Sequence, residues 1–389
     1  MTGTLAEGMP VRSSSSHRAR NLLGSGLTEL FLLARARGAI DLAVGTPSCP
    51  QTPGAMIAAA AAALHAGRNQ YEDPWGEADL RRQIALSLNT PADPATEITV
   101  TVGATEALCV ALLATVDPGD EVIVLEPFYE NFLGAITLAG GLPRFVPLTP
   151  PDWRLDSRAL TAAFGPRTRA IVLNTPSNPT GRTLSFEELN EIAEACERWG
   201  VTVISDEVYA GLVFDGRVHL SIADIPRMRP YGIVVGSLSK SLAISGWRLG
   251  FLRAGPRRTQ LLRRVHEVTT NGAAAPLQYG ASQAGVLRGD WWDPASELVR
   301  CRDRMQRTLR AMGLQCSTPD GGCFLLAGIS AVTGAGAPEY VRQLLDERAV
   351  LVVPGTGFFA DPARGRAYIR VAFNRAPDVL DAADRNLLA

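Results

Sequence analysis

The sequence has 389 residues, a formal net charge of −1 at pH 7, 46% hydrophobic residues and 20% charged residues. This composition is ordinary for a soluble globular enzyme, and the length suffices for roughly two to three domains. The balanced charge argues against a nucleic-acid partner and against an acidic interaction tail. Six cysteines and four histidines are scattered without metal-ligand spacing, so we expect no metal and a reducing, cytoplasmic location.

The N-terminal segment is polar and includes four consecutive serines. It lacks the apolar central run of a secretory signal, so we expect residues 1–20 to form a flexible arm. The chain contains no run of 18 or more apolar residues, and we therefore expect no membrane partner.

Short apolar strands alternate with amphipathic helices between about residues 98 and 255. One helix is expected to begin near Ala104, and another to cover 186–200, where Gly200 closes it. This alternation predicts a mostly parallel sheet flanked by helices on both faces. The predicted strands are ITVTV (98–102), EVIVLEP (121–127), AIVLNTP (170–176), VTVISDE (201–207) and GIVVGS (232–237).

The pattern changes after about residue 290. A long helix at 296–313 precedes separate strands at 321–329, 349–355 and 367–374, which is typical of a smaller α+β domain. We therefore predict an α/β fold whose large domain is joined by a small domain built from both chain ends. The predicted boundaries are 1–20 for the arm, 21–48 for the N-terminal part of the small domain, 49–289 for the large domain and 290–389 for the C-terminal small domain.

Four polar clusters directly follow predicted strands. Ligands of open α/β sheets bind beyond the carboxyl ends of the strands, so these clusters are candidates for one site. The clusters are GATEAL (103–108), NTPSNPTG (174–181), SDEVY (205–209) and SLSK (237–240).

The last cluster contains Lys240, the only lysine among 38 lysine and arginine residues. A GC-rich coding bias explains the missing lysines but not the remaining one. Unlike arginine, lysine can lose its proton and attack a carbonyl carbon. We therefore treat Lys240 as a candidate catalytic residue.

Seven motifs, in order and covering nearly all of the chain from about residue 22, resemble the fold type I pyridoxal-phosphate enzymes. The resemblance is to the aspartate-aminotransferase-like family and is nearest to its kynurenine/methionine aminotransferase branch. It implies pyridoxal 5'-phosphate as cofactor, an L-amino acid and a 2-oxo acid as substrates, and a homodimer with shared active sites. The motifs are NQYEDPWGEADLR (69–81), GATEAL, EPFYENF (126–132), NTPSNPTG, SDEVY, SLSKSLAISGWRLG (237–250) and RVAF (370–373).

The resemblance assigns roles around the cofactor ring. Lys240 would form the aldimine with the cofactor and carry the α-proton, and Asp206 would keep the pyridine nitrogen protonated. Asn178 and Tyr209 would donate to the phenolic oxygen. Tyr129 would stack on the ring, although the register leaves Phe128 as a competitor.

The resemblance also assigns residues that would bind the cofactor phosphate and the substrate. Tyr71 would reach the phosphate of the neighbouring subunit, with an aromatic core residue as the alternative. Arg370 would bind the substrate carboxylate together with Asn178, and Gly45 would let the chain pass close to the substrate. The other phosphate ligands would be Gly103, Ala104, Thr105, Ser237, Ser239 and Arg248.

Two questions stay open in the sequence. Ser48 and Cys49 stand where relatives often carry an acidic and an aromatic residue, which favours a neutral, aromatic or specialised amino acid over aspartate. The same cofactor shell also serves a lyase, a cyclase or an oxidase, and these remain the alternative to an aminotransferase. A sensor that regulates transcription is disfavoured, because residues 1–20 are too short for a DNA-binding domain.

Overall fold

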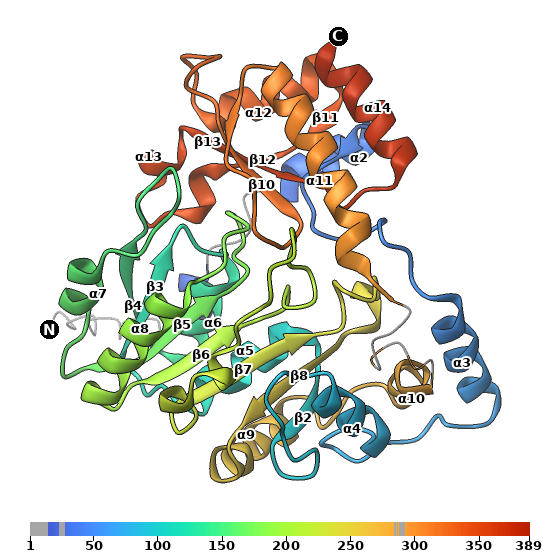
Figure 1. Ribbon diagram of the computed structural model, residues 1–389, viewed down its shortest axis with the longest axis vertical. Helices are drawn as coiled ribbons and strands as arrows, with labels where there is room; N and C mark the ends of the chain where they lie inside the picture. The colour runs from blue at the N-terminus through green and yellow to red at the C-terminus, as the bar shows by residue number, and fades with distance from the viewer. Residues whose placement is uncertain (1–14, 23–27, 284, 286, 288–291) are drawn as a thin grey trace, which may run out of the picture.

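A seven-stranded sheet forms the centre of the large domain in the computed structural model (Figure 1). The structure describes residues 15–22, 28–283, 285, 287 and 292–389. The strand order is β2-β8-β7-β6-β5-β3-β4, and only β8 runs antiparallel to its neighbours. The predicted mostly parallel sheet is therefore confirmed. The strands are β2 (Ile98–Val102), β3 (Glu121–Glu126), β4 (Leu142–Pro147), β5 (Thr168–Asn174), β6 (Thr202–Asp206), β7 (Gly232–Ser237) and β8 (Leu249–Ala254).

Helices cover both faces of this sheet, which explains why its central strands are buried along their whole length. Every residue of β3 and of β6 is buried. One face packs against α5 (Gly103–Leu113), α6 (Asn131–Ala139) and α9 (Pro256–Thr269), and the other against α7 (Ser157–Ala163) and α8 (Phe186–Trp199).

Helix α8 confirms the predicted helix at 186–200 and shows how the sequence sets its ends. Ser185 and Glu188 form a capping box at the start. Gly200 ends the helix in the left-handed region, with φ of 66°, where glycine is strain-free.

The small domain combines both ends of the described chain. Strand β1 (Ile40–Asp41) pairs in parallel with β11 (Val350–Leu351), so the N-terminal segment lies among the C-terminal elements (Figure 1). A four-stranded antiparallel sheet lies beside them in the order β12-β13-β10-β9. Its strands are β9 (Gln315–Cys316), β10 (Phe324–Gly328), β12 (Val353–Pro354) and β13 (Tyr368–Ala372), and the helices of this domain include α2 (Thr28–Ala36), α11 (Pro294–Ala311), α12 (Ala337–Arg348) and α14 (Pro377–Leu388).

Several elements differ from the sequence prediction. The expected strand 349–355 is divided between β11 and β12, which belong to two different sheets. Strand β4 was not predicted because its prolines and exposed side chains hide the strand pattern. The expected arm ends early, since His17–Asn21 forms helix α1, capped by Ser16; residues 1–14 lie outside the described residues.

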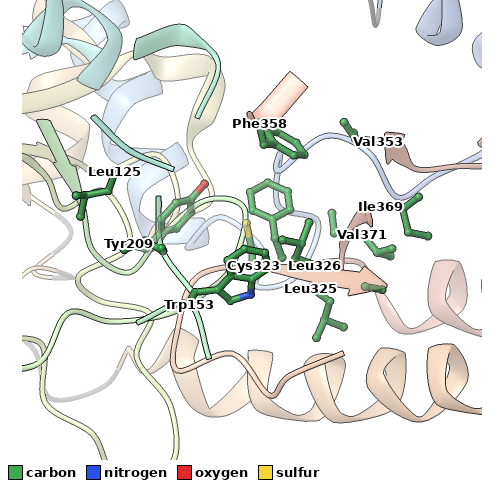
Figure 2. Packing of buried hydrophobic residues seen from close by; sticks show 14 of the residues in the cluster. Leu125, Trp153, Tyr209, Cys323, Leu325, Leu326, Val353, Phe358, Ile369 and Val371 are labelled. Carbon is green, nitrogen blue, oxygen red and sulfur yellow. The ribbon is translucent and has the colours of Figure 1, made fainter. Parts of the chain in front are cut away.

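One apolar cluster joins the two domains. Figure 2 shows Tyr209 of the large domain on one side of Cys323, with Ile369 and Val371 of the small sheet on the other. The rings of Tyr209 and Phe324 meet edge to face with centroids 6.4 Å apart. The domains therefore share a packed junction, and the cavity described below lies at it. Within the described ranges, no helix is both long and apolar enough to cross a membrane.

Candidate active site

A cavity of about 660 Å³ opens between the large and the small domain, at the carboxyl ends of β5, β6 and β7. Asn174, Asp206 and Ser237 are the last residues of these three strands, and all three line the cavity. The predicted residues that line it are Gly45, Ala104, Thr105, Tyr129, Asn178, Asp206, Tyr209, Ser237, Ser239, Lys240, Arg248 and Arg370.

Lys240 is held in this cavity by a single backbone acceptor. Its Nζ donates to the carbonyl oxygen of Gly45 at 3.0 Å. Burial lowers the pKa of Lys240, and the nearby charges of Arg248 and Arg370 lower it further. The amine is therefore easier to deprotonate than an exposed lysine.

Asp206 is a buried carboxylate without a cationic hydrogen-bond partner among the described residues. The backbone N–H of Val208 donates to it at 3.2 Å. Burial raises the pKa of Asp206 to about 7, and the charge of Glu207 adds to the effect. A cationic group bound beside Asp206 would reverse this shift.

Arg370 reaches the cavity from β13, on the opposite side from the large sheet. Its Nη1 donates to Oδ1 of Asn178 at 2.9 Å and its Nη2 to the carbonyl of Ala43 at 3.0 Å. The guanidinium lies over the ring of Phe324, 4.2 Å from the centroid. These contacts fix the planar fork in one orientation.

A second set of donors lies at the N-terminus of α5. Gly103 has a φ of 74°, and a Cβ there would lie 2.4 Å from Nη2 of Arg248. Nearby, the N–H of Ser239 donates to Oγ of Ser237 at 3.0 Å. A helix N-terminus, two hydroxyls and a guanidinium make a suitable cradle for a phosphate group.

The structure separates the two aromatic candidates for the ring contact. Tyr129 lines the cavity, and its hydroxyl accepts a hydrogen bond from Nδ2 of Asn131 at 2.7 Å. Phe128 points into the core, where it stacks on Phe145 with centroids 5.4 Å apart. Burial raises the pKa of Tyr129 to about 12, so it stays neutral.

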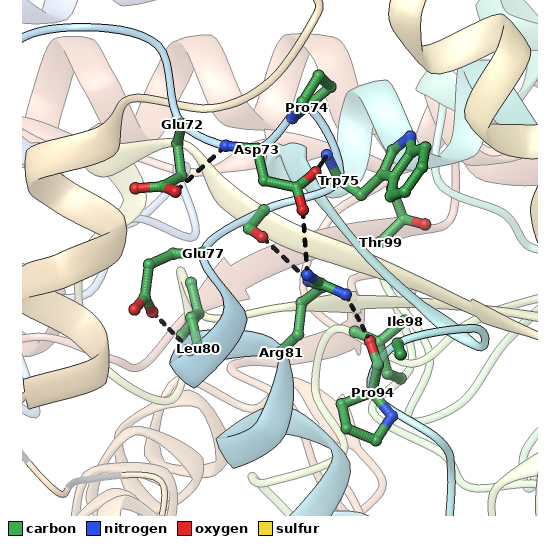
Figure 3. Close-up of polar contacts among 12 residues, drawn as sticks. Glu72, Asp73, Pro74, Trp75, Glu77, Leu80, Arg81, Pro94, Ile98 and Thr99 are labelled. Atoms are coloured by element: carbon green, nitrogen blue, oxygen red, sulfur yellow. Dashed lines mark hydrogen bonds and ion pairs between the residues drawn. The ribbon is translucent and has the colours of Figure 1, made fainter.

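Tyr71 does not meet the other candidates within one chain. Its side chain is 89% exposed, which rules out the core alternative. The segment that follows Tyr71 is nevertheless held in place, because the side chain of Arg81 donates hydrogen bonds to Asp73, Gly76 and Pro94 (Figure 3). Arg81 donates to the carbonyl of Gly76 at 3.0 Å and to the carboxylate of Asp73 at 3.2 Å.

Two residues of the N-terminal segment lie elsewhere than expected. Val44, Gly45 and Thr46 line the cavity, but Ser48 and Cys49 do not. The hydroxyl of Ser48 accepts from the N–H of Ala376, and Cys49 is buried beside Cys301. The side chains of Ser48 and Cys49 contact α11 and the start of α14 instead, and the expected substrate class stays a prediction.

Sequence reasoning missed Asn174, which organises its neighbours. Its Oδ1 accepts from the N–H of Asn178 at 2.6 Å, and its Nδ2 donates to the carbonyl of Asp206 at 3.0 Å. The signal was present, since Asn174 opens the quoted NTPSNPTG cluster at a strand end. Glu130, a further lining residue, carried no comparable signal.

The donor set fits pyridoxal phosphate. Asp206 lines the cavity as a buried carboxylate that a cationic ring nitrogen would stabilise, and the cradle around Arg248 suits the phosphate. Lys240 supplies an amine with a lowered pKa in the same cavity. Fold and site together define a pyridoxal-phosphate enzyme of fold type I.

The chain belongs to the aminotransferases of class I and II, a family that matches residues 37–383. It is 34% identical to the probable N-succinyldiaminopimelate aminotransferase DapC of Mycobacterium tuberculosis, over 95% of this chain and 97% of that protein. It is 32% identical to human kynurenine–oxoglutarate transaminase 1, over 92% and 94%. The crystal structure of Escherichia coli YbdL, reported with a methionine aminotransferase function, has a TM-score of 0.91 at 31% identity, over 96% of this chain and 99% of that one.

These relatives support an aminotransferase over the lyase, cyclase or oxidase alternative. The protein is thus a pyridoxal-phosphate-dependent transferase of amino groups.

Proposed function

We propose that this aminotransferase moves the amino group of a neutral, aromatic or specialised L-amino acid to a 2-oxo acid, with Lys240 as the proton-transferring residue. The observation that carries the proposal is the shared cavity of Lys240, Asp206 and Arg370. The cations among its described lining residues are Lys240, Arg248 and Arg370. None of the described lining residues of one chain is a further arginine that could bind the side-chain carboxylate of aspartate.

When bound, pyridoxal phosphate supplies an aldehyde that captures amines and a ring that withdraws electrons from the α-carbon. Nζ of Lys240 would take the proton from the α-carbon, because its lowered pKa favours the neutral amine. Asp206 would hold a positive charge at the ring nitrogen. Arg370 would bind the α-carboxylate through its fork.

Two finer points are part of the proposal. The exposed side chain of Tyr71 supports a homodimer in which each Tyr71 reaches the site of the partner subunit. Sedimentation of the purified protein should then give twice the 41.5 kDa chain mass. The six cysteines are all free thiols, which supports a cytoplasmic location.

The deciding experiment adds single amino acids to the cofactor-loaded protein without any 2-oxo acid. A transferase should change the cofactor absorption once and release one equivalent of 2-oxo acid, because the amino group stays on the enzyme. Continued product formation, with the original absorption restored, would instead identify a lyase, cyclase or oxidase reaction.

Lys240→Ala tests the proposed role of the lysine. The variant should lose covalent attachment of the cofactor, measured by borohydride reduction and mass spectrometry. Its turnover should fall by about 10²–10⁴-fold, the usual contribution of an acid–base group. Full turnover in Lys240→Ala would exclude this role.

A further inference from the structure

One charged residue that lines the cavity has no role in the proposed function. Lys240, Asp206, Arg248 and Arg370 have roles in cofactor or α-carboxylate binding under the proposed function. The fifth charged lining residue is Glu130, which stands directly after Tyr129. Its side chain is available to meet the part of the substrate that varies between amino acids.

Glu130 does not serve the fold in an obvious way. It is the N-cap residue of α6, yet its side chain makes no capping hydrogen bond. Its Oε2 is buried without a hydrogen-bond partner in the described part of the chain. A buried acceptor without a partner is costly, and such atoms in native proteins usually await a ligand or a water molecule.

Glu130 is close enough to Arg370 and Tyr129 for its charge to act on both side chains. After burial, which lowers the pKa of Arg370, the charge of Glu130 is the largest influence and raises it. The same charge also raises the pKa of Tyr129. Glu130 therefore lines the same cavity as these two residues and lies within electrostatic range of both.

The cavity lining also has an apolar part. Leu22, Phe31, Gly134 and Leu138 line it, and the last two belong to α6, the helix that follows Glu130 and begins with the polar Asn131. A substrate side chain in this cavity can therefore meet both the carboxylate of Glu130 and hydrocarbon. The cavity thus combines one hydrogen-bond acceptor, Oε2 of Glu130, with several apolar lining residues.

We infer that Glu130 selects the amino donor, by accepting a hydrogen bond from an N–H group on the substrate side chain and repelling a side-chain carboxylate. The inference rests on the proposed function and names its substrate class: amino acids whose side chain carries an amide, amine or ring N–H on an apolar stem. A charge-assisted hydrogen bond in such a site is worth about 1.5–3 kcal/mol, or roughly tenfold to a hundredfold in specificity.

The test compares nearly isosteric donors in the cofactor-loaded enzyme with one common 2-oxo acid. Glutamine and glutamate differ only in the group that would face Glu130, and norleucine serves as an uncharged reference. The wild type should prefer glutamine to glutamate in kcat/KM. In Glu130→Gln, the glutamine-to-glutamate ratio should fall by about tenfold to a hundredfold.

Two further variants secure the result. Glu130→Asp keeps the charge and should retain the direction of the preference. Glu347→Gln removes an exposed carboxylate on α12 and should leave the ratio unchanged. A ratio that stays within twofold in Glu130→Gln, or a wild type that prefers glutamate to glutamine, overturns the inference. If Glu130→Gln fails to fold, a wild type that prefers glutamate still overturns the inference, and a loss of the preference in Glu130→Ala supports it. Failure of every amino acid to react with the wild type would instead refute the proposed function.

Discussion

Arg370 and Asn178 are hydrogen-bonded across the domain junction, with 2.9 Å between Nη1 and Oδ1. Arg370 belongs to β13 of the small sheet, and Asn178 follows β5 of the large one. The bond joins positions 192 residues apart in the chain. The proposed carboxylate ligand is therefore positioned by both domains.

Arg370→Lys should weaken amino acid binding, because lysine cannot reproduce the two-pronged fork. Loss of one charge-assisted hydrogen bond predicts a fall in kcat/KM of about tenfold to a hundredfold. Steady-state kinetics with the best donor measures this fall. Arg342→Lys, on the exposed face of α12, is the matched control and should leave kcat/KM unchanged. Equal kcat/KM values for both variants would show that Arg370 does not bind the substrate.

Asp206→Asn should change the free energy of unfolding of the cofactor-free protein by an amount that depends on pH. Burial raises the pKa of Asp206 from 3.8 to about 7, so the folded state keeps a proton that the unfolded state has lost. Between these values the wild type therefore loses stability as pH rises, by up to about 4 kcal/mol. Asp206→Asn removes this loss.

Urea unfolding of both cofactor-free proteins at pH 4 and pH 8 checks this sign. The variant should gain stability over the wild type at pH 8 and much less at pH 4. The same variant should bind pyridoxal phosphate more weakly, since the neutral amide does not hold a positive charge. A stability difference that is the same at both pH values would contradict the assignment.

Gly45→Ala should disturb the cavity wall. A Cβ at this position would lie 2.6 Å from Cζ of the buried ring of Phe324, and the Gly45 carbonyl holds Lys240. Overpacking of this kind costs about 1–3 kcal/mol of unfolding free energy. Activity should fall as well, because the lysine loses its acceptor geometry.

The matched control is Gly54→Ala at the start of α3 (Gly54–His65), where a Cβ would meet nothing within 4 Å. It should be neutral or slightly stabilising, since alanine favours the helix. Denaturant midpoints and specific activity of the two variants give the comparison. Similar stability of Gly45→Ala and the wild type would show that the ring of Phe324 can shift to make room for the added methyl group.

His266→Gln should destabilise the link between α5 and the segment that carries Tyr71. Nδ1 of His266 lies 2.7 Å from Oε1 of Glu106, and Nε2 lies 2.7 Å from the carbonyl of Pro74. Two acceptors require a protonated ring. Burial lowers the pKa of His266, but these contacts outweigh it and raise the pKa above 6.5.

A raised histidine pKa stabilises the fold fully below 6.5 and loses that effect as pH rises through the folded-state pKa. The difference in unfolding free energy between wild type and His266→Gln should thus be larger at pH 6 than at pH 9. Breaking a buried pair costs about 3–5 kcal/mol at the lower pH. A pH-independent difference would show that the ring is neutral.

The sequence alone determined the α/β class and predicted most of the polar residues that line the cavity. Strand ends are marked by polar residues directly after apolar runs, and parallel strands bring those ends to one edge of a sheet. This is why the sequence predicts that Asp206, Ser237 and Asn178 lie together. Lys240 stood out by its residue type, because neutral-amine chemistry is closed to arginine.

Only the tertiary structure decided which side chains face the cavity. Tyr129 and Phe128 are neighbours with similar rings, and the turn before α6 sends one to the cavity and the other to the core. Ser48 and Cys49 turn away although Gly45 and Thr46 do not. Side-chain direction depends on packing against distant segments, and local sequence patterns do not encode it. The contact of Lys240 with Gly45, 195 positions apart, forms because the segment that follows β1 passes the carboxyl end of β7.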